Sequence, residues 1–205
     1  MAMRTGLING LQPQTENIET KEREVIEPME SKEDAFIRLY SEVVSTFASG
    51  LMFHTDASLK SNVIGLHGFK RLHRYNAFKD REMMLKYQHY VADNCREIIK
   101  VNWSELKIPE YDNIKDMFSV YLDYETEKQE KLSKIYKEFI NHDFILDAKM
   151  ISEHLCELNK EIVKCKRYIQ DFESSGWSWH HIRRVDMNLH DKYKKLEEEK
   201  YSYKD

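Results

Sequence analysis

The sequence has 205 residues, 33% of them charged, and a net charge of −4. This balance excludes a protein that coats nucleic acid, because phosphate binding needs a clear excess of Lys and Arg. No apolar run approaches the roughly 18 residues of a membrane span, and the N-terminus lacks a signal-peptide core, so we expect a cytoplasmic protein without membrane contact. Few Gly and Pro and long periodic segments predict an all-α chain.

The first 30 residues are polar and aperiodic, which predicts a flexible N-terminal extension over 1–30. A first long helix should begin after Ser31, an N-cap residue with acidic residues in the following turn. We expect it to end near residues 55–58, with a connection over 54–62. Its inner face is spaced at helical intervals and comprises Phe36, Tyr40, Val43, Phe47, Leu51 and His54.

A second helix is predicted from about Val63 to Asn94. Steps of four and three residues place one set of side chains on its inner face, namely Phe69, His73, Asn76, Asp80, Met83, Tyr87 and Tyr90. This face is aromatic at both ends and polar in the middle. Because an isolated buried charge is costly, Asp80 should be neutralised, paired or bound to a metal.

The segment from Cys95 to Tyr111 contains Pro109, which blocks helix continuation. Extended, it is long enough to cross a bundle of helices that are each about 45 Å long. A third helix should start after Asp112 or Asn113 and run to about Ile140. Its inner face is apolar except at Glu125, and comprises Phe118, Tyr121, Glu125, Leu132, Ile135 and Phe139.

After a turn at residues 141–143, a fourth helix is predicted over about 144–173, and a short fifth helix over about 179–195. Residues 196–205 form a charged tail. Four long helices with a long linker between the second and third predict a four-helix bundle with a single long crossover, here over residues 31–195.

Three stretches resemble ferritins, over roughly residues 33–193. GFKRLHRYNAFKDREMM resembles the second-helix signature of the family, in which GF, an Arg, an Ala and then E-E-R-x-H recur at this spacing. NIKDMFSVYLDYETEKQEKLSKI resembles the start of the third helix of bacterial, non-haem ferritins. SSGWSWHHIRRVDMNLHDK resembles the region leading into the short fifth helix. The resemblance implies a homo-oligomeric, twenty-four-subunit cage that stores iron.

The resemblance also implies a di-iron ferroxidase centre with ligands from all four helices, since two irons need several carboxylates to balance their charge. Helix one has Arg38 or Leu39 where the family has a Glu. Helix two has Asp80 in place of a Glu and Met83 in place of a His, and a thioether is a poor iron ligand. Helix three keeps Glu125.

On the fourth helix, Leu155, Leu158 and Ile162 face inward near the middle, whereas Glu157 and Glu161 lie off that stripe. Asp80 and Glu125 are therefore the candidate metal residues, as remnants of a degenerate di-iron centre. Three interpretations stay open: a working ferroxidase centre, a single weakly bound metal ion, or carboxylates kept by the fold. In the last case the partners of the two carboxylates would be residues such as Arg38, Asn76, His73 or Lys128.

The histidines, cysteines and methionines of the sequence do not form a recognisable metal or haem site. His180 and His181 point to different sides of a helix, and with His190 they are interpreted as surface residues. Three scattered cysteines predict free thiols rather than disulfides or a zinc site. No haem is predicted, since neither Met52 nor Met83 can be matched to a haem ligand of the family.

These observations favour a ferritin-like cage subunit that binds or stores iron, with lost or strongly reduced ferroxidase activity. Two alternatives remain: a structural or interaction cage protein that no longer handles iron, and a helical partner-binding bundle that does not assemble. Whether the chain is an enzyme is undecided by the sequence, because the ligand set is incomplete.

Overall fold

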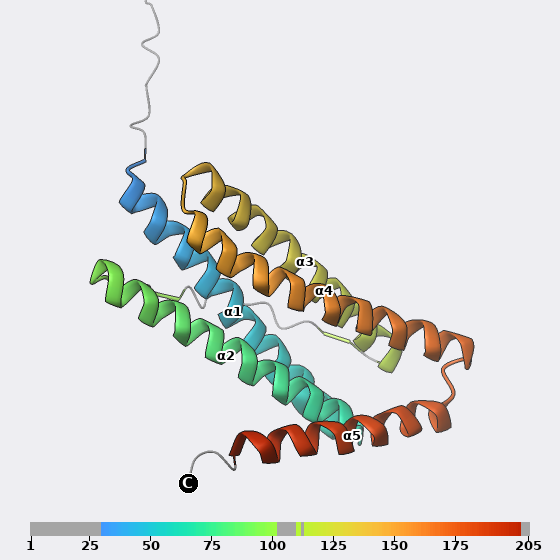
Figure 1. Ribbon diagram of the computed structural model, residues 1–205. Coiled ribbons are helices and arrows are strands. Elements are labelled where there is room, and N and C mark those ends of the chain that lie inside the picture. The colour runs from blue at the N-terminus through green and yellow to red at the C-terminus, as the bar shows by residue number, and fades with distance from the viewer. Residues whose placement is uncertain (1–29, 102–109, 112, 202–205) are drawn as a thin grey trace, which may run out of the picture.

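The computed structural model describes residues 30–101, 110–111 and 113–201. Five helices account for most of them, and the all-α prediction is confirmed (Figure 1). Their bounds are α1 Lys32–Val63, α2 His67–Cys95, α3 Ile114–Asn141, α4 Ile145–Ser174 and α5 Trp179–Tyr201. The predicted flexible extension falls outside the described residues except for its last residue.

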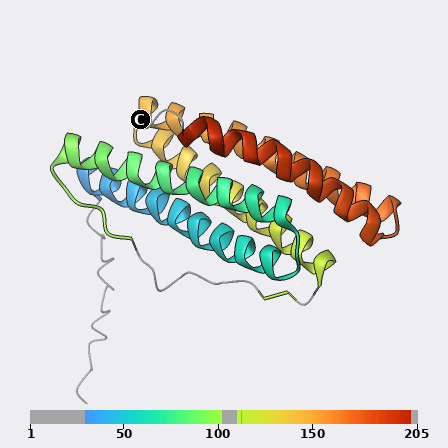
Figure 2. The ribbon, with the colours of Figure 1, turned by 90° about the horizontal axis from the view of Figure 1, so that it is seen from below.

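The first four helices form a bundle of two antiparallel hairpins, α1 with α2 and α3 with α4 (Figures 1 and 2). Contacts between α2 and α3 advance together along both helices, from Phe69–Phe118 to Asp80–Lys128. The two helices are therefore parallel, and α3 begins at the end of the bundle where α2 begins. The single long crossover follows from this arrangement, as predicted.

Side-chain caps fix two of the helix starts. The Ser31 side chain accepts a hydrogen bond from the Asp34 amide at 3.0 Å, and Asn113 caps α3 in the same way from the Asp116 amide at 3.0 Å. The predicted connection over residues 54–62 is wrong, because α1 continues to Val63. Two residues after the helix ends, Gly65 turns the chain with a φ of 77°, a conformation that favours glycine.

The start of α2 has no capping side chain of its own, and α5 supplies one. The buried carboxylate of Asp186 accepts hydrogen bonds from the amides of Gly68 at 2.8 Å and Phe69 at 2.9 Å. A Cβ at Gly68 would lie 1.8 Å from the Asp186 carbonyl oxygen, so only glycine permits this close approach. α5 therefore lies alongside the first half of α2, and it extends beyond the predicted end at residue 195 to Tyr201.

Two hydrophobic clusters fill the bundle, one toward each end. The first lies between the N-terminal half of α1 and the C-terminal half of α2, and the second includes residues from α5. A belt of buried polar side chains separates the clusters and consists of His54, His73, Asn76, Asp80, Glu125 and Lys128. This belt is the polar middle that the second-helix pattern predicted.

Candidate functional site

The belt is centred on an ion pair between α2 and α3. Lys128 Nζ lies 2.6 Å from Asp80 Oδ1, and the two residues are only 7% and 6% exposed. The second oxygen, Oδ2, has no hydrogen-bond partner among the described residues. It lies against Gly50 of α1, where an added Cβ would be 2.0 Å from it. Of the partners proposed for Asp80, Lys128 is the one found in contact.

The second carboxylate of the belt belongs to a chain of polar side chains that starts on α3. His54 Nε2 donates to Glu125 Oε1 at 3.0 Å, and the Nδ1 atoms of His54 and His73 are 3.1 Å apart. A single proton is shared between the two Nδ1 atoms, so one ring donates and the other accepts. Asn76, another proposed partner, instead donates to the hydroxyl of Tyr121 at 3.2 Å.

Burial and charge set opposite pKa directions for the two carboxylates. Burial raises the pKa of Asp80, and the nearby Lys128 ammonium opposes this. Burial acts the same way on Glu125, but the hydrogen bond and charge of His54 outweigh it, so the pKa of Glu125 is lowered. Burial also lowers the pKa of His73 well below its ordinary value.

A cavity of about 260 Å³ borders the ion pair and is lined by residues of α1, α2, α3 and α4. Its α4 wall comes from His154, Leu158 and two glutamates, Glu157 and Glu161. We expected these glutamates to lie off the inward stripe, yet both reach the cavity. Each is already paired with a lysine three residues along α4, at 2.6 Å and 3.0 Å, so neither is an unpartnered ligand.

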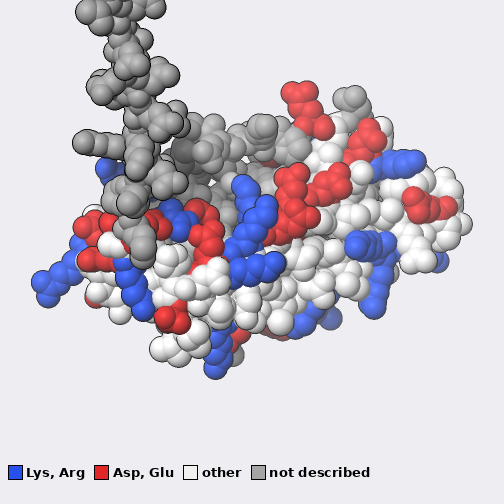
Figure 3. All heavy atoms as spheres, turned by 90° about the horizontal axis from the view of Figure 1, so that it is seen from above, with Lys and Arg blue, Asp and Glu red and all other residues white. Residues whose placement is uncertain are grey.

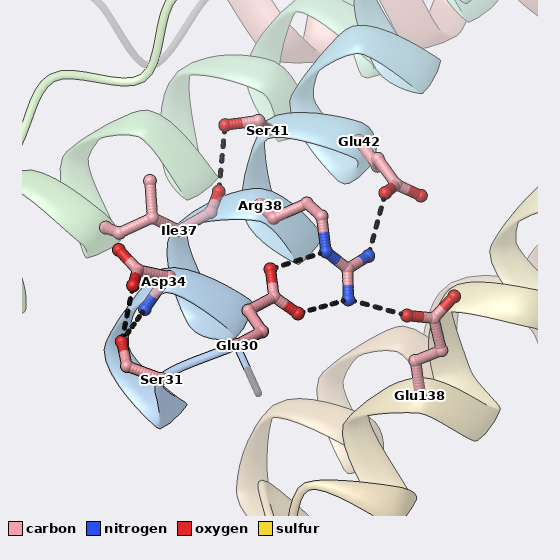
Figure 4. A network of polar contacts seen from close by, with 8 residues as sticks. All are labelled: Glu30, Ser31, Asp34, Ile37, Arg38, Ser41, Glu42 and Glu138. Atoms are coloured by element: carbon pink, nitrogen blue, oxygen red, sulfur yellow. Dashed lines mark hydrogen bonds and ion pairs between the residues drawn. The ribbon is translucent and has the colours of Figure 1, made fainter. Parts of the chain in front are cut away.

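Neither of the two helix-one positions predicted from the resemblance lies in the belt. Leu39 is buried in the first hydrophobic cluster, and Arg38 lies near the surface, with 38% of its side chain exposed. It donates to Glu30, Glu42 and Glu138 near the start of α1 (Figure 4). The residue of α1 that faces Asp80 is Gly50, three turns further along the helix. A local sequence pattern places Arg38 and Leu39 on α1 but does not set the register of α1 against α2.

Lys128 was among the partners expected from the sequence, whereas Gly50, which lies against the belt, was not singled out. Lys128 follows Glu125 by three residues, which places both on one helix face. Gly50 is an isolated glycine inside a predicted helix, and such a glycine often marks a place where another part of the chain packs closely against the helix. The convergence of Gly50 on Asp80 required the register between α1 and α2, which a single sequence does not provide.

The residues present do not fit a di-iron centre. At the cavity α1 contributes Phe47 and Gly50 rather than a carboxylate, and the two glutamates of α4 are each already paired with a lysine. Met83 is half-buried at the cavity and offers a thioether, a poor ligand for iron. Among the residues that the structure describes, no three His, Cys, Asp or Glu side chains are placed to hold one metal ion.

No protein-family model and no curated protein matches this sequence. Solved structures do match its fold. A ferritin from Archaeoglobus fulgidus, engineered to a closed form, superimposes with a TM-score of 0.68 at 13% identity, covering 75% of this chain and 93% of that chain. Apo-ferritin from Pseudo-nitzschia multiseries gives 0.64 at 14% identity, covering 75% and 98%. The chain has the ferritin fold.

This ferritin-like chain shares its fold with these structures. The sequence identity is too low to assign the functional residues of those proteins to this chain. The predicted fifth helix and crossover are confirmed with the fold. Cys95, Cys156 and Cys165 are free, as expected. None of the described helices is both long and apolar enough to cross a bilayer.

Proposed function

We propose that this chain assembles with copies of itself into a ferritin-like shell that holds iron without a working ferroxidase centre. One observation carries the proposal: at the bundle centre α1 presents Gly50, where a di-iron cluster would need a carboxylate. The two carboxylates that remain, Asp80 and Glu125, each have a protein partner. Iron would then collect on carboxylates facing the cavity of the shell.

The fold shared with ferritins supports assembly. Single exposed apolar side chains, such as Val63 and Leu146, are normal on a protein surface and do not add to that support. The shell, with twenty-four subunits as the resemblance implies, is tested by particle mass and by negative-stain imaging.

Iron handling is tested by adding ferrous iron anaerobically, admitting air and following ferric absorbance. We expect the rate to stay near that of a protein-free control, and to be the same in Asp80→Ala/Glu125→Ala. A ferritin with a complete centre serves as the positive control. Fast oxidation that disappears in the double variant would overturn the proposal.

An alternative function is a shell that no longer handles iron. It is favoured by the finding that no group of three potential ligands is placed for a metal ion within the described parts of the chain. Iron retained per subunit after desalting separates the two candidates. Retention well above that of a non-ferritin protein supports storage, whereas none supports the alternative.

A further inference from the structure

Each of the two carboxylates at the bundle centre contacts a nitrogen donor from the chain itself. Lys128 neutralises Asp80 at 2.6 Å, and His54 donates to Glu125 at 3.0 Å. A buried carboxylate needs a partner, and a metal ion is one way to provide it. Here a protein group already stands at each carboxylate.

We propose that the ammonium group of Lys128 takes the place of a bound metal cation at this centre, holding α2 to α3 and closing the centre to metal ions. The proposal goes beyond assembly and iron storage, because it concerns how the subunit itself is held together. It predicts a bundle that folds and remains stable without any divalent ion.

Three features of α3 and α1 build this contact into the fold. On α3, Lys128 lies one turn after Glu125, so its stem and that carboxylate share a face. On α1, the Phe47 ring centroid is 5.3 Å from Nζ, within range of a cation–π interaction. Also on α1, Gly50 leaves room for the pair, since a Cβ there would lie 2.9 Å from Nζ.

Burial distinguishes this pair from the ordinary ion pairs of the surface. The side chains of Lys128 and Asp80 are 7% and 8% exposed, against 70% and 56% for Lys160 and Glu157. Exposed pairs contribute little because water screens them. Lys128 is closer to Asp80, at 2.6 Å, than the His54 ring, at 3.9 Å. A buried carboxylate that loses its closest cation becomes poorly compensated, so removal of Lys128 should have a large effect.

The neighbouring cavity makes a direct replacement experiment possible. It is about 260 Å³ in volume and is bordered by both Asp80 and Lys128. In Lys128→Ala, the removed ammonium leaves a place that a small cation from solution can reach. Methylammonium reproduces the lost group, and Mn²⁺ prefers carboxylate oxygens.

The measurement is thermal unfolding of the full chain after treatment with a chelator. We expect Lys128→Ala to unfold at a lower temperature than wild type, and either methylammonium or Mn²⁺ to raise its midpoint by several degrees in a saturable manner. The two cations should compete for the same place. Wild type should respond to neither cation, apart from effects shared with the control variant.

Lys131→Ala removes an exposed lysine of the same helix and is the matched control, with no expected response. Asp80→Asn/Lys128→Met removes both charges together, and should fold without responding to cations. If Lys128→Ala does not fold alone, its refolding yield with methylammonium becomes the readout. A Lys128→Ala chain that neither cation stabilises or refolds would overturn the proposal, as would Mn²⁺ stabilising wild type as strongly as the variant.

Discussion

At the scale of single residues, packing at the bundle centre depends on the absence of a Cβ atom at Gly50. Glycine within a helix is normally unfavourable relative to alanine by about 0.5–1 kcal/mol. Here a Cβ would lie 2.0 Å from Asp80 Oδ2 and 2.7 Å from its Cγ. The carboxylate has little freedom to move away, because Lys128 holds its other oxygen. The usual preference for alanine should therefore be reversed at this position.

Gly50→Ala is accordingly expected to destabilise the chain by about 1–3 kcal/mol, as overpacking does elsewhere. Ser49→Ala, at the neighbouring and half-exposed position, should change stability by less than about 0.5 kcal/mol. Urea denaturation of both variants measures the difference. A Gly50→Ala chain that is as stable as wild type, or more so, would show that Asp80 is not confined as described.

At the scale of elements, α5 is attached by a polar contact as well as by apolar packing. Asp186 accepts from two amides at the start of α2, where backbone N–H groups would otherwise lack partners. A carboxylate is also favoured there by the helix dipole. Gly68 permits the two backbones to approach, and the Arg183 guanidinium donates to the Gly65 carbonyl at 2.7 Å. The start of α2 and the middle of α5 therefore form one unit.

Loss of this cap should be measurable. Asp186→Ala is expected to cost about 1–2 kcal/mol, in the range of other lost helix caps, while Asp186→Asn keeps an acceptor oxygen and should cost less. Asp191→Ala, whose side chain is 79% exposed on the same helix, is the control. Chemical denaturation gives the values, and hydrogen exchange at the Gly68 and Phe69 amides should accelerate only in the Asp186 variants. Unchanged exchange there would contradict the cap.

At the scale of the whole molecule, surface charge and buried histidines have different consequences. Basic and acidic side chains are intermixed on the face seen in Figure 3, in agreement with the small net charge. Inside, burial lowers the pKa of His154 to about 4 and that of His73 well below its ordinary value. Both histidines are then neutral in the folded chain at pH values where the unfolded chain is protonated.

Acidification should therefore destabilise the subunit. Between pH 6.5 and about 4 the unfolded chain binds more protons than the folded one, so stability falls as pH falls. For His154 the loss is about 2 kcal/mol after allowance for its partial exposure. Thermal unfolding against pH should show a weaker slope in His154→Gln and an unchanged slope in His89→Gln, an exposed control. Equal slopes in all three chains would disprove the assignment.

The sequence by itself determined the helices and which face of each is buried. Helical periodicity places Tyr40, Asp80, Glu125 and their neighbours inward, and burial follows directly from that spacing. The Ser31 cap was also predictable, since a cap depends on residues within one turn. Local rules of this kind need no knowledge of the partner helix.

Only the tertiary structure decided which inward residues meet. The end of α1 at Val63 sets the register that brings Gly50, rather than Arg38, to Asp80. A second register, between the parallel helices α2 and α3, brings Lys128 to Asp80. If one helix slid along another by a turn, its apolar face would still point into the bundle. Helical periodicity is therefore compatible with many registers between the helices. The choice among them rests on packing across the whole bundle, and that packing fixes the chemistry at its centre.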